Sequence, residues 1–531
     1  MNSKSLWILL LFLQPIIGYK ILFMCPFPAP SHWLWLEHFA RGLLDRGHHV
    51  TALTNFKTKE PHNNYTEIII EPKFDIPYYF PKRDIFEMKF NSDFQNLFMW
   101  WKVGELTSEH ALNDSKVRQL INSETHNFDL IILEQFFHES FLMFAHKFKA
   151  PIVTIGTFGY ADNMDHSMGL LTPWSFVPHL VLPYSDNMNY IQRSYNTFLS
   201  LFDLIMRRFY YYPRMQNMAE RYFKTIVDEN ETLPHVRDLE KNISMIFVNS
   251  HRSTSPPRPS ITGLLNVGGV HIKPPKALPV DIKKFLDDSK HGVIYFSLGS
   301  YMKSIEMPPR SVKIILETFA KLKENVLWKY EDESIPNLPK NVMVKKWLPQ
   351  NDVLAHKNIR LFITHGGIFG TQEGIFHAVP MLYMPLYGDQ HRNTLKSVQE
   401  GYALSIDFSK LTVESLYDKI TRLLTDTKFK HRINELSIAF KDNPMHPLDE
   451  SMYWIEYVIR HKGARHLKSA AVNLHWWQYI LLDVFGLYIL AFIFLLYVTY
   501  RILLYFKHIF GLIRKEKIKN NNTRGGKRIA G

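Results

Sequence analysis

Short apolar runs and segments of helical periodicity alternate along the first half of the chain. A run over 21–25 is followed by a proline-rich loop, a helical pattern over 33–46 and a second run over 50–54, and runs over 130–133 and 152–155 flank another helical pattern. Short continuous apolar runs predict strands that are buried on both faces, and a helix between two such strands predicts a parallel βαβ unit. We therefore expect an open α/β domain in this half.

Residues 174–223 break this alternation. They contain thirteen aromatic residues and little of the regular change between apolar and polar positions that is typical of strands. Two interpretations remain open for this region: ordinary packing between helices, and a pocket or membrane-facing surface for apolar molecules.

The second half repeats the βα alternation after a stretch, 266–290, that is dense in glycine, proline and lysine. Such a composition, without a long apolar period, is typical of an interdomain linker. Beyond it, an apolar run over 292–300 and a helical pattern over 309–322 are followed by further runs, which predict a second doubly wound domain with its own sheet. A chain of 531 residues is long enough for two such domains.

Both ends of the chain differ from the middle. The first 18 residues contain an apolar run that ends before the small Gly18, which is typical of a secretory signal peptide over 1–18. Residues 479–500 carry a single charge, Asp483, and are long enough to cross a bilayer. The tail over 501–531 is basic, so the positive-inside rule predicts that it is cytosolic and that the chain before the span is lumenal.

This tail explains most of the positive charge of the chain. Nine Lys and Arg residues against one Glu give the tail +8 of the net charge of +13. We therefore expect a membrane and not a nucleic acid as the partner of the basic residues. Lumenal exposure also predicts glycosylation at four acceptor sequons: Asn64, Asn113, Asn230 and Asn242. A fifth sequon, at Asn521, lies in the cytosolic tail and should stay unmodified.

The cysteine and histidine residues argue against internal disulfides and against a zinc site. The only cysteine, Cys25, ends an apolar run, so we expect a small buried side chain and no internal disulfide. No Cys and His cluster has the spacing of a zinc site. We therefore expect domains that are stabilised by large apolar cores, without a metal.

One turn in the second half is a candidate binding site. An apolar run over 361–364 leads through His365-Gly366-Gly367 into a helical pattern that starts near Gly370. Free backbone N–H groups and the positive end of the helix dipole favour an anion such as phosphate at such a turn. An ordinary connection between a strand and a helix has the same pattern, so this sign alone leaves both interpretations open.

A further apolar strand over 381–386 strengthens the binding-site interpretation. Ligands of open parallel sheets lie at the carboxyl ends of the strands. The loops after 361–364 and 381–386 therefore open on the same side, so that His365 and the Asp389-Gln390 pair should face one crevice. Glu373 is close enough to the start of the helix to contact a ligand there.

The segment WLPQNDVLAHKNIRLFITHGGIFGTQEGIFHAVPMLYMPLYGDQ strongly resembles the signature of the UDP-glycosyltransferases, in particular the membrane-bound animal branch. FSLGS at 296–300 and WIEYVIRHKGARHLKSAA at 454–471 match as well, as do the signal, the span and the tail. The resemblance implies a GT-B fold of two Rossmann-like domains with a cleft between them. It implies an acceptor domain over 19–265, a linker over 266–290 and a UDP-sugar domain over 291–450. Helices over 451–478 return to the first domain, and a membrane span over 479–500 and a cytosolic tail over 501–531 follow.

The resemblance also assigns the donor site. Trp347 matches the residue whose ring stacks on uracil, Gln350 a contact to the base or ribose, and Glu373 the carboxylate that accepts the ribose hydroxyls. The Asp389-Gln390 pair matches the residues that bind the sugar hydroxyls. The diphosphate is assigned to Ser300, His365, Gly367 and Gly370. Phe369 and Gly370 stand where an Asn and a Ser are common in plant members, so this chain should hold the diphosphate more through its backbone.

His32 falls where the family has its catalytic base, in the loop between the first strand and helix. A histidine has a suitable pKa to deprotonate a hydroxyl near neutral pH. The family's partner Asp is replaced here by Glu134, which can still orient and stabilise an imidazolium. The implied reaction is a direct displacement with inversion at the sugar, with UDP-sugar as co-substrate and no metal or cofactor.

The resemblance further bears on the donor, the acceptor and the location. Relatives that use glucuronate carry an Arg where Asn249 stands, so we expect UDP-glucose as donor and small lipophilic hydroxyl compounds as acceptors. The expected location is the endoplasmic reticulum membrane, single-pass with lumenal catalytic domains. The oligomeric state is left open, and a homo-oligomer is compatible with the sequence. The alternative from another class is a non-catalytic membrane-anchored carrier or receptor for small lipophiles.

Overall fold

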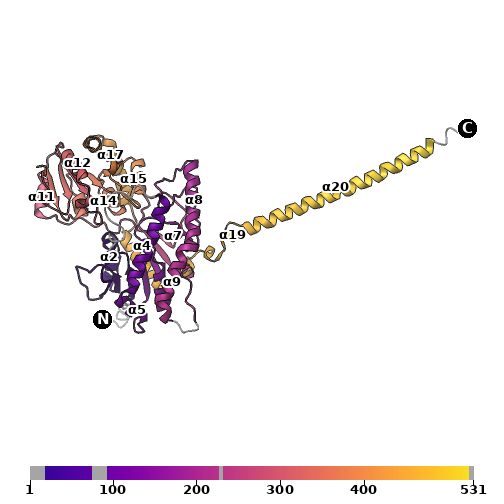
Figure 1. Cartoon of the computed structure of the whole chain (residues 1–531), viewed down its shortest axis with the longest axis horizontal. Helices are drawn as coiled ribbons and strands as arrows, with labels where there is room; N and C mark the ends of the chain where they lie inside the picture. The colour runs from indigo at the N-terminus through magenta and orange to yellow at the C-terminus, as the bar shows by residue number, and fades with distance from the viewer. Residues whose placement is uncertain (1–17, 75–91, 227–230, 526–531) are drawn as a thin grey trace, which may run out of the picture. The chain divides into compact units, whose positions relative to one another are not determined.

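The structure is a computed structural model that describes residues 18–74, 92–226 and 231–525. The predicted signal peptide, apart from Gly18, and the sequon at Asn230 lie outside these residues. The chain divides into two compact units, one up to Ser469 and one from Ala470 onward. The first unit contains both sheets and most of the helices (Figure 1).

The first sheet contains seven parallel strands, which confirms the open α/β architecture. The strand order is β3-β2-β1-β4-β5-β6-β7. The order reverses between β1 and β4, so the loops that follow these two strands diverge and leave a crevice at their carboxyl ends. The strands are β1 Lys20–Cys25, β2 His49–Thr54, β3 Tyr65–Ile69, β4 Leu130–Glu134, β5 Ile152–Gly156, β6 Met245–Val248 and β7 Leu264–Asn266.

The second sheet repeats this design with six parallel strands in the order β10-β9-β8-β11-β12-β13. Its order reverses between β8 and β11, which creates a second crevice of the same kind. The strands are β8 Val293–Ser297, β9 Asn325–Lys329, β10 Val342–Lys345, β11 Ile359–Thr364, β12 Met381–Tyr383 and β13 Ala403–Ser405.

Helices cover both faces of the first sheet, and its two faces form separate apolar cores. The aromatic region 174–223 folds mainly as helices that pack beside α4 on one of these faces (Figure 1). The helices are α2 Pro30–Asp45, α4 Asp93–Asn113, α5 Ser115–Asn122, η3 Glu139–Leu142, α6 Met143–Phe148, α7 Asp162–Ser167, α8 Tyr190–Met206, the π-helix η4 Arg207–Tyr211, α9 Tyr212–Phe223, η5 Lys224–Ile226 and α10 Val236–Glu240.

The second sheet is also covered on both faces. One of its helices, α11 Val280–Asp287, lies within the stretch 266–290 that the sequence analysis assigned to a linker. Its side chains Ile282 and Leu286 are buried in the core of the second sheet, so the extended connection covers only 267–279. The other helices are η6 Ser304–Glu306, α12 Pro309–Phe319, α13 Gln350–Leu354, α14 Ile368–Phe376, α15 Gln390–Gln399, η7 Phe408–Lys410, α16 Val413–Thr425 and α17 Thr427–Lys441.

After α17 the chain returns to the first sheet. Helix α18, Pro447–Arg460, buries Met452, Ile455 and Val458 in the same core as residues of α2. A side chain at Gly42 would meet the sulfur of Met452 at 3.0 Å, so a glycine here allows the two helices to approach closely. The first unit ends with the short helix η8 Arg465–Leu467.

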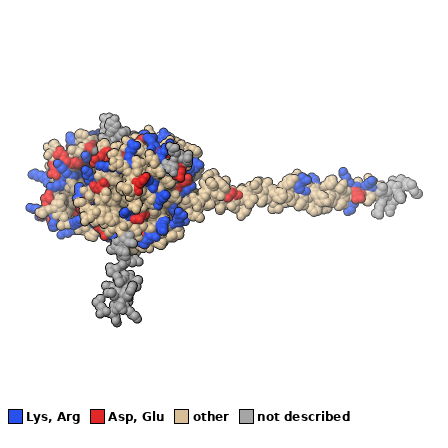
Figure 2. All heavy atoms as spheres, turned by 90° about the horizontal axis from the view of Figure 1, so that it is seen from below, with Lys and Arg blue, Asp and Glu red and all other residues tan. Residues whose placement is uncertain are grey.

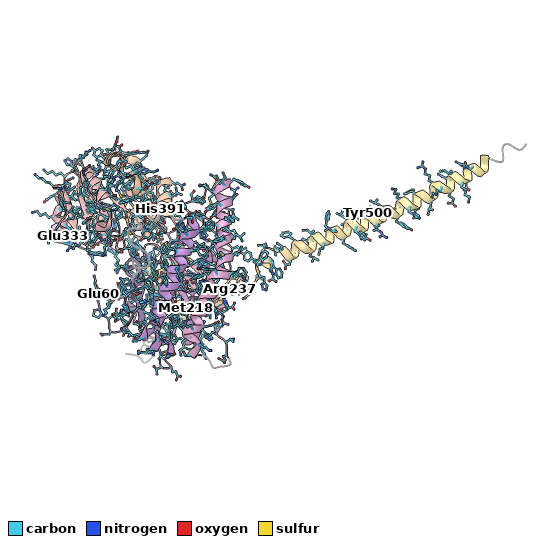
Figure 3. All side chains as sticks on the ribbon, viewed as in Figure 1. Glu60, Met218, Arg237, Glu333, His391 and Tyr500 are labelled. Atoms are coloured by element: carbon cyan, nitrogen blue, oxygen red, sulfur yellow. The ribbon has the colours of Figure 1, made fainter. Side chains whose placement is uncertain are left out.

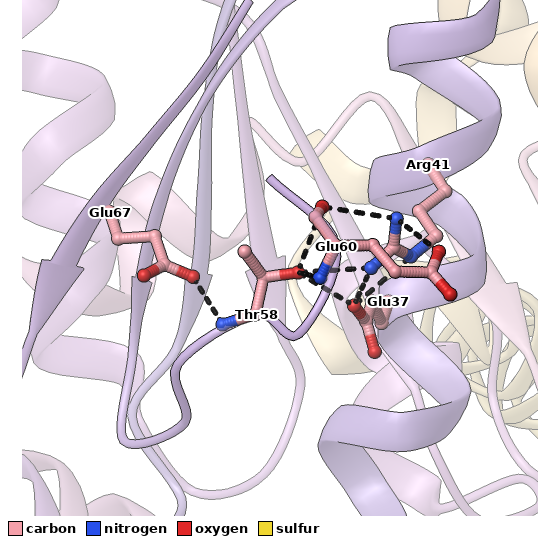
Figure 4. Close-up of polar contacts among 5 residues, drawn as sticks. All are labelled: Glu37, Arg41, Thr58, Glu60 and Glu67. Carbon is pink, nitrogen blue, oxygen red and sulfur yellow. Dashed lines mark hydrogen bonds and ion pairs between the residues drawn. The ribbon is translucent and has the colours of Figure 1, made fainter. Parts of the chain in front are cut away.

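A polar network fixes α2 to the loop that follows β2 (Figure 4). The guanidinium of Arg41 contacts the carboxylate of Glu37 at 2.6 Å, the hydroxyl of Thr58 at 2.9 Å and the carboxylate of Glu60 at 3.1 Å. The backbone N–H of Thr58 donates to Glu67 on β3 at 2.6 Å. These contacts hold the helix whose first turn carries His32.

The second unit contains η9 Ala470–Asn473, α19 Trp476–Tyr479 and the long helix α20 Leu482–Gly525. Among the described residues, α20 is the one helix that is long and apolar enough to cross a membrane. It starts at Leu482 and not at Tyr479, because the chain breaks its helical path between α19 and α20. No Lys, Arg, Asp or Glu lies between Asp483 and Arg501 (Figure 2), and Tyr500 is one of many exposed side chains of this helix (Figure 3).

Candidate active site

A cavity of about 740 Å³ lies where the carboxyl ends of the two sheets meet. Loops after β1, β4 and β5 of the first sheet and after β8, β11 and β12 of the second line it. Both points at which the strand order reverses therefore open into the same space. The cavity is thus positioned by the topology of both domains.

The side of the cavity that the first domain forms contains the predicted His32 and Glu134. His32 lies in the first turn of α2 and not, as predicted, in the loop before it, because the helix already begins at Pro30. Glu134 is the last residue of β4. The Nδ1 atom of His32 is 2.5 Å from Oε1 of Glu134, and the hydroxyl of Thr157 is 3.1 Å from both atoms. The structure therefore brings the two residues together, with a glutamate spanning the gap between strand and helix.

Glu134 is fully buried and ionised. Burial opposes its charge, but His32, His138 and the Cys25 thiol together outweigh burial and lower the pKa of the carboxyl group. A carboxylate can only accept hydrogen bonds, so Nδ1 of His32 carries the proton and Nε2 remains free as an acceptor. The thiol of Cys25 is buried, as expected, and it donates to Glu134 at 3.2 Å.

The opposite side of the cavity is the turn between β11 and α14. Helix α14 begins at Ile368, two residues earlier than expected, with Gly367 as its N-cap and no side-chain cap. Its first N–H groups have no partner within the helix and are therefore available to an anion. A side chain at Gly299 or Gly367 would collide with the ring of His365, at 2.8 and 2.6 Å. Burial, together with the charge of Lys329, lowers the pKa of His365 to about 4, so this ring is neutral at pH 7.

Trp347, Gln350 and Glu373 line the cavity from the second domain. Trp347 is 60% exposed, so its ring is free to stack on a flat ligand. The amide nitrogen of Gln350 donates to Glu373, and its oxygen accepts from the hydroxyl of Tyr295 at 3.1 Å. Burial raises the pKa of Glu373 to about 7. Gly370 packs beside Gln350, where a Cβ would be 3.3 Å from the amide nitrogen.

Asp389, Gln390 and Ser300 also line the cavity. The carboxylate of Asp389 accepts from the amide of Asn393 at 2.7 Å. Burial raises the pKa of Asp389, and the hydrogen bond from Asn393 and the charge of Arg392 partly offset this rise. The side-chain oxygen of Gln390 accepts from the backbone N–H groups of Leu386 and Tyr387, which fixes this side chain at the lining of the cavity.

Asn249 differs from the other candidates because it does not line the cavity. Its side chain is fully buried, donates to the carbonyl of Thr157 at 2.9 Å and accepts from the amide of Gln372 at 2.9 Å. Asn249 therefore joins the first domain to α14. An assignment by aligned position alone does not reveal these partners.

Two further features were not predicted. Among the described residues that line the cavity, Lys329 is the only Lys or Arg, and its ammonium group lies 2.6 Å from Glu331. The one feature of the sequence that could have indicated this role is the position of Lys329, a charged residue at the end of the otherwise mainly apolar strand β9. Phe369, which replaces a polar residue of the plant pattern, packs on Trp35 of the first domain and on His271 of the connection between the domains, with ring centroids 6.0 and 5.7 Å apart.

The described residues contain no group of three or more His, Cys, Asp or Glu side chains that could hold a metal ion. The side of the cavity that the first domain forms is instead apolar and aromatic. Its lining includes Phe27, Met99, Trp100, Phe136, Phe158 and Leu180.

Two Rossmann-like domains that face a shared cavity define the GT-B class of glycosyltransferases. Solved structures of this class have the same fold: the calicheamicin glycosyltransferase CalG4 is 16% identical, with a TM-score of 0.57 over 84% of this chain and 99% of that one. The glycosyltransferase VinC in complex with DTDP is 14% identical, with a TM-score of 0.56 over 83% of this chain and 100% of that one.

The sequence comparisons are more specific. The family model for UDP-glucoronosyl and UDP-glucosyl transferase matches residues 20–517. UDP-glucosyltransferase 2 of Dactylopius coccus is 34% identical over 95% of this chain and 96% of that protein. UDP-glucuronosyltransferase 2B1 of Rattus norvegicus is 30% identical over 87% of this chain and 88% of that protein. The chain belongs to the UDP-glycosyltransferase family and is an enzyme of that class.

Proposed function

We propose that this enzyme transfers glucose from UDP-glucose to a hydroxyl group of a small lipophilic acceptor, with inversion at the anomeric carbon. The observation that supports this proposal is the His32–Glu134 pair, which lies across one cavity from Asp389 and from the start of α14. The apolar lining on the side of His32 suits a lipophilic acceptor.

In the proposed mechanism, Nε2 of His32 takes the proton of the acceptor hydroxyl. The hydroxyl oxygen attacks the anomeric carbon from the face opposite the diphosphate, a new C–O bond forms, and the bond between the sugar and the diphosphate breaks. Glu134 stabilises the imidazolium ion that results, since it is ionised and 2.5 Å away. The proton then leaves His32 for solvent as UDP departs.

The other half of the mechanism concerns the leaving group. Negative charge grows on the diphosphate as its bond to the sugar breaks. The N–H groups at the start of α14, the neutral His365 and the side chain of Ser300 are the proposed donors to it. Lys329 adds the single positive charge of the described cavity lining.

The choice of glucose follows from charge. A glucuronate donor would bring a second carboxylate close to Asp389, and Asn249 supplies no compensating cation to the cavity. The Dactylopius coccus relative is named a glucosyltransferase, whereas the Rattus norvegicus relative is named a glucuronosyltransferase. The greater similarity to the former supports the same choice.

We further propose that the enzyme is anchored in the endoplasmic reticulum membrane by α20, with both catalytic domains in the lumen. Asn113 and Asn242 are exposed and Asn64 is partly exposed, so all three are accessible to glycosylation. Removal of N-linked glycans should increase the electrophoretic mobility of the protein from membranes, and protease added outside sealed microsomes should cut only the tail. An unchanged mobility would argue against a lumenal location.

The direct test is a screen of donors against acceptors on permeabilised membranes. UDP-glucose, UDP-glucuronate and UDP-galactose would be combined with phenols and alcohols, and the products identified by mass. We expect transfer from UDP-glucose, and we expect His32→Ala to cut turnover by on the order of 10² or more while UDP binding is kept. Ligand binding without transfer from any donor would instead support the non-catalytic carrier.

A further inference from the structure

Helix α8 and the π-helix η4 that continues it bury a mainly polar face and expose an apolar one. The buried face carries Asn196, Ser200, Asp203 and Arg207 beside a single fully buried apolar residue of α8, Leu199. The exposed face carries large apolar side chains at helical spacing, and Ile191 and Phe209 near its two ends are 78% and 72% exposed. The full exposed set is Tyr190, Ile191, Phe198, Leu201, Leu204, Ile205 and Phe209, which we call the α8 apolar face.

The buried polar contacts fix this orientation. The amide of Asn196 donates to the carbonyls of Trp174 and Val177 at 2.8 and 2.9 Å. The carboxylate of Asp203 lies 3.4 Å both from the guanidinium of Arg207 and from the ring of His179. A rotation of the helix that buried its apolar face would break these buried contacts, which is costly. The α8 apolar face therefore stays directed outward, as Figure 1 shows for α8 at the edge of its domain.

We propose that the α8 apolar face docks into the surface of a lipid bilayer. A contiguous exposed apolar stripe on a helix marks an interaction site, and an amphipathic helix can bury such a stripe in the headgroup and acyl boundary of a membrane. The chain itself supplies the membrane: the candidate span begins at Leu482, thirteen residues after the first unit ends at Ser469. An extended chain covers about 3.5 Å per residue, so the first unit remains within about 45 Å of the bilayer.

Charge supports a lipid surface as the occupant. The exposed charged residues of α8 and η4 are Arg193 and Arg208, whereas Arg214 on α9 is paired with Glu105 at 3.9 Å. The only carboxylate between Tyr190 and Arg214 is Asp203, which is buried. Cations beside an apolar helix face complement anionic lipid headgroups.

The location of α8 relates this docking to the reaction, a point that rests on the proposed function. Leu180, Val181 and Pro183, just before α8, line the cavity. The hydroxyl of Tyr195 on α8 donates to Asp93, another lining residue, at 2.9 Å. Docking of α8 would therefore bring one wall of the cavity to the lipid surface, where lipophilic acceptors concentrate.

The test uses the full chain in lipid nanodiscs that contain anionic lipid. The single native cysteine, Cys25, is buried and serves as the unlabelled background. Leu201→Cys and Ile205→Cys would each carry an environment-sensitive fluorophore. Ile438→Cys, on α17 and 72% exposed, is the matched control. UDP binding by each variant confirms its folding.

We expect a blue shift and a loss of intensity with spin-labelled lipid for the labels at 201 and 205, together with protection from aqueous iodide. The label at 438 should be quenched by iodide and not by the lipid. Equal iodide quenching at all three positions would overturn the proposal. Protection from iodide without quenching by the lipid would also overturn it, and would assign the face to another protein or a second copy. None of these readouts requires transfer activity, so the result is independent of the proposed donor and acceptor.

Discussion

The contact between His32 and Glu134 allows a quantitative prediction for Glu134→Gln. In the parent enzyme, a buried carboxylate 2.5 Å from Nδ1 stabilises the imidazolium that forms as the acceptor loses its proton. Two charges about 4 Å apart interact by about 4 kcal/mol at the effective dielectric constant of 20 that describes protein sites. Glutamine has the same shape without the charge, so we expect kcat to fall by about 10³-fold, while the affinity for UDP stays unchanged.

Glu134→Asp distinguishes the effect of the negative charge from the effect of the hydrogen bond to His32. The side chain is shorter by one methylene, which withdraws the carboxylate by about 1.5 Å and increases the distance to Nδ1 to about 4 Å, beyond a hydrogen bond. The charge remains, so we expect a kcat between those of the parent and Glu134→Gln. Thr157→Val is the control, because it removes a neighbouring hydroxyl but leaves the carboxylate in place.

The assay is single-turnover transfer from UDP-glucose to a phenol, with UDP binding measured separately by calorimetry. A Glu134→Gln enzyme that turns over within about twofold of the parent would refute the reasoning. It would mean that Glu134 does not stabilise the imidazolium, and that its contact with His32 is only structural.

Three further predictions concern residues around the donor. Lys329→Met should lower kcat by about 10²-fold, because it removes the positive charge from the described cavity lining, and an unchanged kcat would exclude a role in leaving-group stabilisation. The pKa of Glu373 is raised to about 7, and only its ionised form accepts two ribose hydroxyls, so calorimetry should show UDP binding that strengthens as the pH rises through 7. Glu373→Gln should flatten this dependence, and the same slope in both proteins would assign it to another group. Asn249→Arg should lower the melting temperature and leave the ratio of glucose to glucuronate transfer unchanged, because the side chain is buried away from the cavity. A rise in relative glucuronate use would show that residue 249 does reach the donor sugar.

The parallel sheets were predictable because their strands are continuous apolar runs. The run over 130–133 of β4, for example, is buried along its whole length and contains no polar residue. The position of the phosphate turn followed, since the carboxyl end of a parallel strand is where its loop can bind a ligand. The resemblance to a family then supplied residues such as His32 and Glu134, which lie 102 positions apart in the chain and which local pattern does not connect.

Other features depended on tertiary packing and were not predictable. Helix α11 has only two buried apolar residues, so its proline-rich and lysine-rich surroundings indicated a linker. Asn249 was expected to bear on donor choice from its aligned position, but hydrogen bonds to Thr157 and Gln372 decide where its side chain lies. Lys329 was missed because a lysine at a strand end is usually solvated, and only the folded cavity reveals its location.

The return of α18 to the first domain has a mechanical consequence. The chain crosses between the domains twice, once over 267–279 and once between α17 and α18, and the ring of Phe440 stacks on His251 next to the second crossing, with centroids 3.8 Å apart. Two covalent connections define a hinge axis between the domains. We expect the domains to open and close about this axis and to resist twisting, because a twist would stretch one link. Distances between spin labels on the two domains, measured with and without UDP, should then change along one direction, so that every closure returns His32 to the same register with the donor.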